Sequence, residues 1–372
     1  ACHSRFEHSL GVLHVASRMA QKLGLSDNQI RIVRYAALLH DIGHGPLSHN
    51  FEDILKSSND QKVSHEDITR KIIPEDIAIG KILKQDQQNV LDLFDEENES
   101  VSKEIISSYF DADKLDYLRR DSYHTGVTYG VFDFERILHT INVTENDRSY
   151  LTILWKGKDA LENFRLARYL MHVQVYQHHV RAISDNMFRR AVQIAIRDGT
   201  LDTDFFDIED ENFLENYLSI DDIRFFDRIL SRSCPENNDY KLIKCLENRS
   251  LLKRGYEVNV KKLDLSKKRK IITMKPSQFG EIEEKLAGEV GCDKDFVILY
   301  KQEIENTLYR SSYASFKANE TPLIVEDEYG NLHDFDEESS IHSDQEPLLK
   351  FYIFCPGEVE DKIRTVAEDI LF

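Results

Sequence analysis

The amino-acid sequence predicts a mainly α protein, with an all-helical domain over residues 1–255 followed by a small α+β domain over residues 256–372. Three observations predict this organisation. The chain has 372 residues, which favours two domains or one large domain with an appendage. Apolar residues recur at helical spacing up to about residue 255, and short β-rich runs appear only after it. A helical region followed by a mixed region favours two separate packing units.

The first two helices have the clearest signals. Residues 5–23 carry two apolar stripes at helical spacing, one of which includes His8, so we expect this helix to be buried on more than one face. Ser26 and Gln29 form a capping box for a second helix over 27–41. Further helical patterns follow at 66–73, 101–121, 133–140, 158–198, 220–231 and 240–253.

The second domain is predicted from short apolar runs. The runs with β-rich composition are IITM (271–274), FVILY (296–300), PLIVED (322–327) and LLKFYIF (348–354). Two helical patterns, at 277–288 and 358–370, lie between or after them. The segment DEYGN, residues 327–331, separates two apolar runs and predicts a hairpin turn.

Composition excludes several classes of partner. No stretch of eighteen or more uncharged apolar residues occurs, so we expect no membrane-spanning helix. The net charge of -19 disfavours binding to nucleic acids or anionic membranes. The 5 cysteines are scattered and form no C-x-x-C pair, which favours a reducing, cytoplasmic location. The chain begins Ala-Cys-His-Ser without a methionine, so we expect it to lack its natural N-terminal segment.

The stretch LLHDIGHGPLSH, residues 38–49, indicates a metal site. His40 and Asp41 are consecutive, so on a helix they point about 100° apart, as two neighbouring vertices of one coordination sphere would. Gly43 supplies the stop for the preceding helix, and the turn beyond it displays His44 and His49 in the same region. Imidazole and carboxylate are the groups that Mn, Fe, Co, Ni and Zn prefer.

Two more ligands must come from elsewhere in the chain. His8, on the buried stripe of the first helix, is one candidate. The segment YFDADKLDYLRRD, residues 109–121, supplies another, because Asp113, Tyr117 and Asp121 repeat every four residues on one helix face. Taken alone, a helix-end aspartate such as Asp113 is usually an N-cap, and a lone histidine on an apolar stripe is usually a satisfied core or surface residue.

Four segments together resemble the HD-domain metal-dependent phosphohydrolases. They are SRFEHSLGV (4–12), LLHDIGHGPLSHNFE (38–52), SHED (64–67) and FDADKLDYLRRDSYHTGV (110–127). Within that superfamily they are similar to the deoxynucleoside triphosphate triphosphohydrolases, both the bacterial dGTPase-like branch and the sterile-α-motif/HD-domain protein of animals. ARYLMHVQVYQH (167–178) fits the same group.

The resemblance implies a role for each matching residue. It implies one divalent metal, held by His8, His40, Asp41 and Asp113. It implies that substrate phosphates are held by Arg5, Lys114 and Arg168, with His44 and His49 beside the phosphate chain. Sugar contacts would come from Tyr117, Tyr176 and Asp121. His65 would be the general acid, supported by Glu52, a position where the animal enzyme carries an aspartate.

One polar stripe supports this interpretation from the residues alone. Arg168, His172 and Tyr176 repeat at every fourth position of the predicted helix over 158–198. On an isolated helix such a stripe is a solvated face, but beside a metal it becomes a wall that binds phosphate. Arginine suits the fork geometry of phosphate oxygens.

The sequence therefore predicts a hydrolase that cleaves deoxynucleoside triphosphates into nucleoside and tripolyphosphate. Mg²⁺ bound to the substrate phosphates, an activating nucleotide and a homo-oligomer, either dimer or tetramer, are further expectations from the resemblance. Two alternatives stay open. One is an HD phosphohydrolase for nucleoside mono- or diphosphates or for a cyclic dinucleotide, although the Gly-Tyr-Pro signature of the cyclic-dinucleotide group is missing. The other is a non-catalytic nucleotide sensor.

Overall fold

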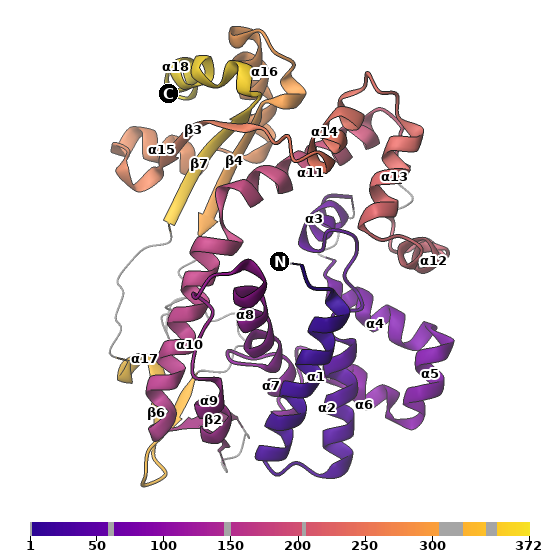
Figure 1. The fold of residues 1–372 in the computed structure, drawn as a ribbon, viewed down its shortest axis with the longest axis vertical. Helices are drawn as coiled ribbons and strands as arrows, with labels where there is room; N and C mark the ends of the chain where they lie inside the picture. Colours follow the sequence, from indigo (N-terminus) through magenta and orange to yellow (C-terminus); the bar gives the residue numbers. More distant parts are fainter. Residues whose placement is uncertain (1, 59–62, 145–149, 203–205, 305–322, 340–347) are drawn as a thin grey trace. The chain divides into compact units, whose positions relative to one another are not determined.

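The computed structural model describes residues 2–58, 63–144, 150–202, 206–304, 323–339 and 348–372 (Figure 1). The chain forms two compact units, each assembled from segments that are distant in sequence. The first unit comprises residues 1–44, 63–175 and 307–344, and the second comprises 45–62, 176–306 and 345–372.

The first unit is mainly helical. Its helices are α1 (Arg5–Lys22), α2 (Asp27–Leu39), α4 (His65–Glu75), α5 (Ile77–Leu83), α6 (Gln87–Asp92), α7 (Val101–Ile106), α8 (Ala112–Thr125), α9 (Phe134–Thr140), α10 (Lys158–Met171) and α17 (Phe335–Glu338). Its strands are β1 (Ile141–Val143), β2 (Leu151–Leu154), β5 (Ile324–Glu326) and β6 (Leu332–Asp334), which form one sheet in the order β1-β2-β5-β6. Only the β2–β5 pair is parallel.

The core that positions the site lies around α1. This helix packs against both α2 and α8, which lie beside it in Figure 1. Its buried apolar face contains Val12, Val15, Ala16 and Met19, and α2 contributes the fully buried Val33. Since α1 is covered on two sides, polar side chains on the same helix are also carried into the interior.

The second unit combines helices with a small sheet. Its helices are α3 (His49–Ser58), α11 (His179–Arg197), α12 (Phe213–Leu218), α13 (Asp222–Arg232), α14 (Asn238–Glu247), α15 (Leu265–Thr273), α16 (Phe279–Val290) and α18 (Glu360–Leu371). The strands β3 (Lys253–Asn259), β7 (Leu348–Cys355) and β4 (Ile298–Ile304) pair antiparallel in that order. Phe351 and Ile353 of β7 pack with Leu286 of α16 and Ile363 of α18 in one apolar cluster.

The predicted fold class is confirmed: a helical region precedes a region with small sheets. The hairpin predicted at 327–331 is also present, since β5 and β6 pair antiparallel across it and Asp327 N–H donates to the Asn331 carbonyl at 2.9 Å. The domain boundary at residue 255 stays a prediction. β5, β6 and α17 follow that boundary in sequence but belong to the first compact unit.

Three predicted elements are wrong. Residues 271–274, predicted as a strand, end the helix α15, because Asp264 caps that helix by accepting from Ser266 N–H and Lys267 N–H. A short apolar run does not distinguish a strand from a helix end. The predicted helix over 101–121 is broken into α7 and α8. The predicted helix over 158–198 is interrupted by a π-helical turn at His172–Tyr176, between α10 and α11.

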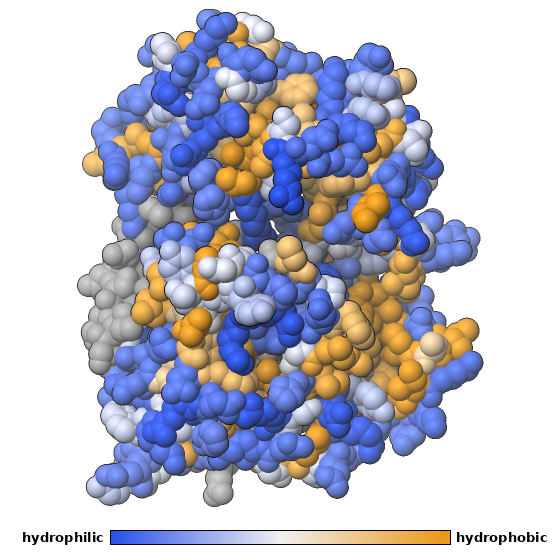
Figure 2. Space-filling view, in the orientation of Figure 1, coloured by the Kyte–Doolittle hydropathy of each residue, from blue (hydrophilic) through white to orange (hydrophobic). Residues whose placement is uncertain are grey.

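The sequence did not predict the strands β1, β2 and β3. β1 and β2 lie within the domain predicted to be all-helical, and β3 begins where a helical pattern was assigned up to residue 253. Figure 2 shows hydrophobic residues gathered on the visible face over α4 and α5, and α5 contributes the exposed side chains of Ile77 and Ile82. Among the described residues, no helix combines the length and apolar content that crossing a membrane requires.

Candidate metal centre

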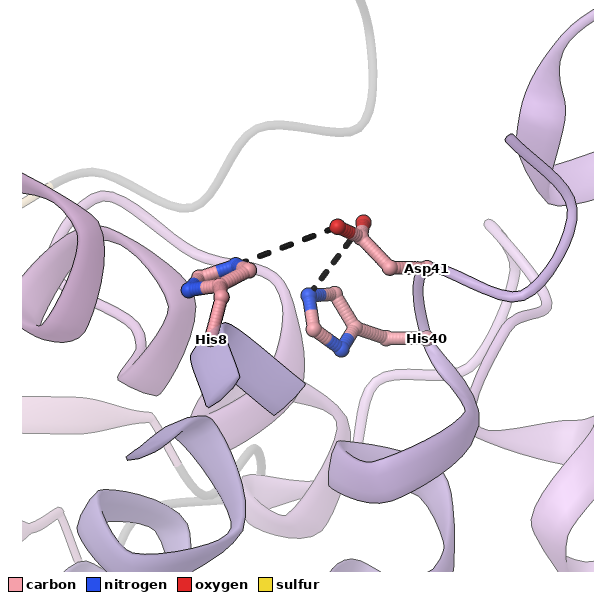
Figure 3. A group of neighbouring side chains, drawn as sticks. All are labelled: His8, His40 and Asp41. Atoms are coloured by element: carbon pink, nitrogen blue, oxygen red, sulfur yellow. Dashed lines mark ion pairs between the residues drawn. The ribbon is translucent and has the colours of Figure 1, made fainter. Parts of the chain in front are cut away.

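His8 reaches the interior from the second turn of α1. The helix begins at a capping box, in which Ser4 and Glu7 satisfy each other's backbone N–H groups. His8 is 7% exposed. Its Nε2 atom lies 3.0 Å from Asp113 Oδ1. The same atom lies 3.9 Å from Asp41 Oδ2 (Figure 3). One imidazole nitrogen of α1 thus faces two carboxylates from other elements.

His40 and Asp41 follow the last turn of α2. His40 Nδ1 bonds to the Ala37 carbonyl at 2.8 Å, and because a carbonyl only accepts, Nδ1 carries the hydrogen. The other ring nitrogen, Nε2, is buried and makes no hydrogen bond, although Asp41 Oδ1 lies 3.3 Å away and Asp113 Oδ1 3.8 Å away. Figure 3 shows His8 and His40 both directed at the Asp41 carboxylate.

Asp113 is available to the site because a different residue caps α8. Asp111 is the N-cap: it accepts from Lys114 N–H at 2.8 Å and from Ser108 N–H at 2.9 Å. The N-cap reading of Asp113 is therefore wrong. With the helix start satisfied by Asp111, the carboxylate of Asp113 points at the two histidines instead.

These donors fit a divalent transition metal. Ligand atoms of His8, His40 and Asp41 all lie within 4.8 Å of one another, and Asp113 adjoins both histidines. Two imidazole nitrogens and two carboxylates are a donor set that such metals favour. The buried Nε2 of His40 supports the fit, because a buried polar atom without a hydrogen bond is costly unless a ligand satisfies it.

The electrostatics of the cluster favour positive charge at its centre. Burial lowers the pKa of His8, but hydrogen bonds with Asp113 and Asp116 outweigh it and raise that pKa to about 9. The pKa of His40 is likewise raised by Asp113 and Asp41 against the effect of burial. Burial raises the pKa of Asp113, yet the two histidines hold it well below its usual range.

His44 and His65 form a second layer beside this cluster. Their rings stack with centroids 3.8 Å apart and planes 11° from parallel, and His44 Nε2 lies 3.5 Å from Asp41 Oδ1. Gly43 permits this arrangement, because a Cβ there would lie 2.0 Å from the His65 carbonyl oxygen and 2.5 Å from Thr69 N. Gly43 does not end the preceding helix as predicted, since α2 already ends at Leu39.

The predicted phosphate-binding residues of the first unit lie on three different elements. Arg5 Nη1 donates to Asp41 Oδ2 at 2.5 Å, next to the two histidines. Lys114 Nζ donates to Asp111 Oδ2 at 2.5 Å. On α10, the Arg168 guanidinium lies 5.5 Å from the centroid of the Tyr109 ring.

The predicted sugar contacts divide between the two units. Tyr117 follows Asp113 by one turn of α8, and burial raises the pKa of its phenol. Asp121 Oδ1 bonds to His3 Nε2 at 2.7 Å. Tyr176 belongs to the second unit, where its carbonyl accepts from Arg181 Nη1 at 2.8 Å. His172 begins the π-helical turn that ends at Tyr176, so the stripe predicted from Arg168, His172 and Tyr176 at four-residue spacing does not continue along a regular α-helix.

His49 and Glu52, the last two of the predicted site residues, are close to each other on α3 of the second unit. His49 Nδ1 lies 3.5 Å from Glu52 Oε1, and Lys56 Nζ lies 3.5 Å from Glu52 Oε2. Glu52 is buried, whereas His49 is exposed. The roles of both residues stay predictions.

The sequence reasoning missed Asp116 and Arg120, which stand directly behind His8. Asp116 Oδ2 lies 2.8 Å from His8 Nδ1, and Arg120 bonds to both oxygens of Asp116. Their spacing was a usable signal. Asp116 lies three residues after Asp113 and Arg120 four residues after Asp116, so the three share one side of a helix.

A helical unit that presents this histidine–aspartate cluster defines an HD-domain protein. Residues 5–125 match the family described as HD domain, and residues 132–372 match the one described as HD associated region. The chain belongs to this HD-domain phosphohydrolase family, as its sequence motifs predicted.

Two curated relatives illustrate the similarity. The uncharacterized protein MJ1154 of Methanocaldococcus jannaschii is 37% identical over 238 residues, which cover 64% of this chain and 49% of that protein. The deoxynucleoside triphosphate triphosphohydrolase SAMHD1 homolog of Dictyostelium discoideum is 30% identical over 285 residues, which cover 70% of this chain and 52% of that one. The chain thus spans about half the length of these relatives.

A solved structure extends the likeness to nearly the whole chain. The crystal structure of a phosphohydrolase from Bacteroides thetaiotaomicron superposes with a TM-score of 0.73 at 25% identity. The match covers 95% of this chain and 87% of the other. The likeness in fold therefore extends over segments of both compact units of this chain.

Proposed function

We propose that the chain is a metal-dependent phosphohydrolase that converts a deoxynucleoside triphosphate into nucleoside and tripolyphosphate. One observation carries this proposal: ligand atoms of His8, His40 and Asp41 lie within 4.8 Å of one another, and Asp113 Oδ1 lies 3.0 Å from His8 Nε2 and 3.8 Å from His40 Nε2. When bound there, a divalent metal such as Mn, Fe, Co, Ni or Zn would polarise a phosphoryl oxygen and lower the pKa of bound water to about 7.

Side chains of the chain itself would bind and orient the substrate. Arg5 and Lys114 already lie against Asp41 and Asp111, so they place positive charge at the edge of the cluster. Arg168 would add a fork for phosphate oxygens from α10. Mg²⁺ could accompany the phosphates. His44 and His49 would lie beside the phosphate chain, with His172, while Tyr117, Tyr176 and Asp121 would contact the sugar.

His65 would serve as the general acid. Water would attack the α-phosphorus and release one proton to solvent, the bond from that phosphorus to the 5′-oxygen would break, and His65 would give its proton to the departing 5′-oxygen. The stacking of His65 on His44, which itself contacts Asp41, supports a role next to the metal ligands. Glu52 is proposed as the carboxylate that assists His65.

The name of the Dictyostelium relative supports the substrate class. A cytoplasmic homo-oligomer, dimer or tetramer, and an activating nucleotide are further parts of the proposal.

The test is a panel of deoxynucleoside and ribonucleoside triphosphates, including dGTP, with each divalent metal in turn. Release of tripolyphosphate and nucleoside is the expected result. Release of diphosphate or monophosphate would instead favour hydrolysis of other nucleotides. Nucleotide binding without any product would favour a sensor, and His65→Ala with full turnover and normal metal content would remove the proposed acid.

A further inference from the structure

Asp116 lies behind His8, on the side away from the cluster, and both of its carboxylate oxygens have hydrogen-bond partners. His8 Nδ1 lies 2.8 Å from Asp116 Oδ2, and the same oxygen accepts from Arg120 Nε at 2.7 Å. The other oxygen, Oδ1, accepts from Arg120 Nη2 at 2.9 Å. Both side chains are mostly buried, with 10% of Asp116 and 22% of Arg120 exposed.

This contact fixes which nitrogen of His8 carries the hydrogen. An ionised carboxylate can only accept, so His8 Nδ1 must donate to Asp116. In the neutral imidazole that a metal requires, the lone pair is then on Nε2, the atom that faces Asp113 and Asp41. The arrangement selects one tautomer and one ring orientation.

The backbone of α1 is shaped to allow this contact. Gly11, one turn after His8, is the residue against which the pair packs: a Cβ there would lie 2.0 Å from Asp116 Oδ1 and 2.3 Å from Arg120 Nη2. Glycine inside a helix costs about 0.5–1 kcal/mol relative to alanine. The chain tolerates that cost at position 11, where a Cβ would displace the carboxylate and its guanidinium.

His40 has a different support. Its Nδ1 donates to the carbonyl of Ala37 in its own helix, which is a neutral acceptor. A carboxylate acceptor makes an imidazole a more basic ligand than a carbonyl does. The two histidines are therefore not equivalent, and His8 is the one whose ligand strength depends on a separate charged pair.

We propose that Asp116, held by Arg120, is a positioning residue that presents the His8 Nε2 lone pair to a divalent metal. The inference rests on the metal centre of the proposed function, but it makes its own predictions about metal affinity in the absence of any nucleotide.

Asp116→Asn is the sharpest test, because it keeps the shape and removes one acceptor. While Arg120 is present, the amide nitrogen meets a donor in either orientation: His8 Nδ1–H and Arg120 Nε–H on one side, or Arg120 Nη2–H on the other. We expect the affinity for Zn²⁺ or Mn²⁺, measured by chelator competition, to fall about 10–100-fold.

A second variant separates positioning from folding. In Asp116→Asn with Arg120→Met, the amide is free to turn its oxygen to His8, so the double variant should bind metal about tenfold more tightly than the single one. A purely structural role for the Asp116–Arg120 pair predicts the opposite, since the double variant loses more contacts. Glu135→Gln is the matched control: Glu135 also holds α1, through two bonds from Arg18 at 2.9 and 2.7 Å, but has no part in the cluster.

Spectroscopy gives a readout that stability alone does not move. In zinc-loaded protein with ¹⁵N-labelled histidine, His8 should show a bonded Nδ1–H signal that disappears in Asp116→Asn and is kept in Glu135→Gln. The proposal is overturned if Asp116→Asn binds zinc within about twofold of the parent and keeps that signal, or if the double variant binds more weakly than the single one. A parent chain that binds no metal would reject the metal centre itself, and the positioning role with it.

Discussion

The helices α1 and α16 have similar features in sequence, but their buried polar side chains have different partners. Each has a glycine in its interior, Gly11 on α1 and Gly288 on α16. Each also has one buried ionisable side chain, His8 on α1 and Glu283 on α16. Glu283 is satisfied by the protein alone, because Arg190 Nη2 donates to it at 2.7 Å and Leu299 N–H at 2.9 Å. His8 directs only one nitrogen to a supporting partner and the other to a cluster of ligand atoms.

The difference distinguishes a structural polar group from a functional one. In α16 every strong bond of the buried carboxylate ends on the surrounding fold, so its removal should cost stability and nothing else. Around α1 the polar atoms converge, and one of them, His40 Nε2, is buried without a hydrogen bond. Burial alone does not mark the site; the convergence of several potential metal-ligand atoms from separate elements does.

The largest expected effect comes from removing a metal ligand. Asp113→Asn takes away the carboxylate that adjoins both histidines, so we expect metal affinity and hydrolysis to fall at least about 100-fold, more than loss of a supporting residue would cause. Metal content after gel filtration and product release measure the two effects.

The counterpart on α16 is Glu283→Gln. It should leave the metal affinity unchanged and lower the free energy of unfolding by about 1–3 kcal/mol, because Arg190 loses its charged partner. Equal metal loss in both variants would remove the distinction between the two helices.

The second effect is the pH dependence of metal binding. His8 must be neutral to bind a metal, and its pKa in the folded chain is raised to about 9. Binding therefore displaces a proton from His8 below that pH, and His40, whose pKa is also raised, adds to the effect, so the affinity should rise by at least about tenfold per pH unit below about pH 9. Calorimetry in buffers of different ionisation enthalpy counts the protons released.

The same raised pKa makes a prediction for stability without metal. The protonated His8 stabilises the folded state fully below the ordinary pKa of 6.5, and this contribution is lost as the pH rises through about 9. The melting temperature of the metal-free chain should therefore fall over that interval, and the fall should be smaller in His8→Gln. Unchanged slopes in His8→Gln would show that other groups are responsible.

The third effect is that of Gly11→Ala, for which helix propensity alone would predict a gain in stability. Alanine favours a helix, but a Cβ at position 11 would lie 2.0 Å from Asp116 Oδ1. We expect metal affinity to fall about tenfold through the displaced Asp116, and the free energy of unfolding to fall by about 1–3 kcal/mol through overpacking. Chelator competition and urea unfolding test both statements, and a gain in stability would contradict the packing argument.

The smallest effect belongs to Gly288→Ala on α16. Apart from its chain neighbours and the backbone of its own helix, no described atom lies within 4 Å of a Cβ built there, so the substitution brings only the helix-propensity gain. We expect the free energy of unfolding to rise by about 0.5–1 kcal/mol with metal affinity unchanged. A loss of stability would show that the two glycines are not the contrasting pair described above.

The sequence predicted most of the helices and the four proposed metal ligands, but not the support behind them. Candidate metal ligands can be recognised from their residue types and from their occurrence together, as with the consecutive His40 and Asp41. Asp116 and Arg120 read as ordinary surface charges, because only the packing of α8 on α1 brings them to His8. The helical spacing of Asp116 and Arg120 placed them on the side of Asp113 but did not point to His8. Gly11 gave no signal at all, because the reason for a glycine there is a contact more than 100 residues away in sequence.

The errors in secondary structure have a common physical cause. The apolar run at 271–274 is compatible with a strand or with the end of a helix, and the N-cap formed by Asp264 favours the helix α15. The break between α7 and α8 depends on Asp111 accepting from Ser108 N–H, a local bond that periodicity does not reveal.

The most direct measurement is anomalous diffraction from crystals of this chain grown with Mn²⁺. One strong peak should appear about 2.0–2.3 Å from the ligand atoms of His8, His40, Asp41 and Asp113. A manganese ion bound elsewhere, with these four side chains turned apart, would contradict the account.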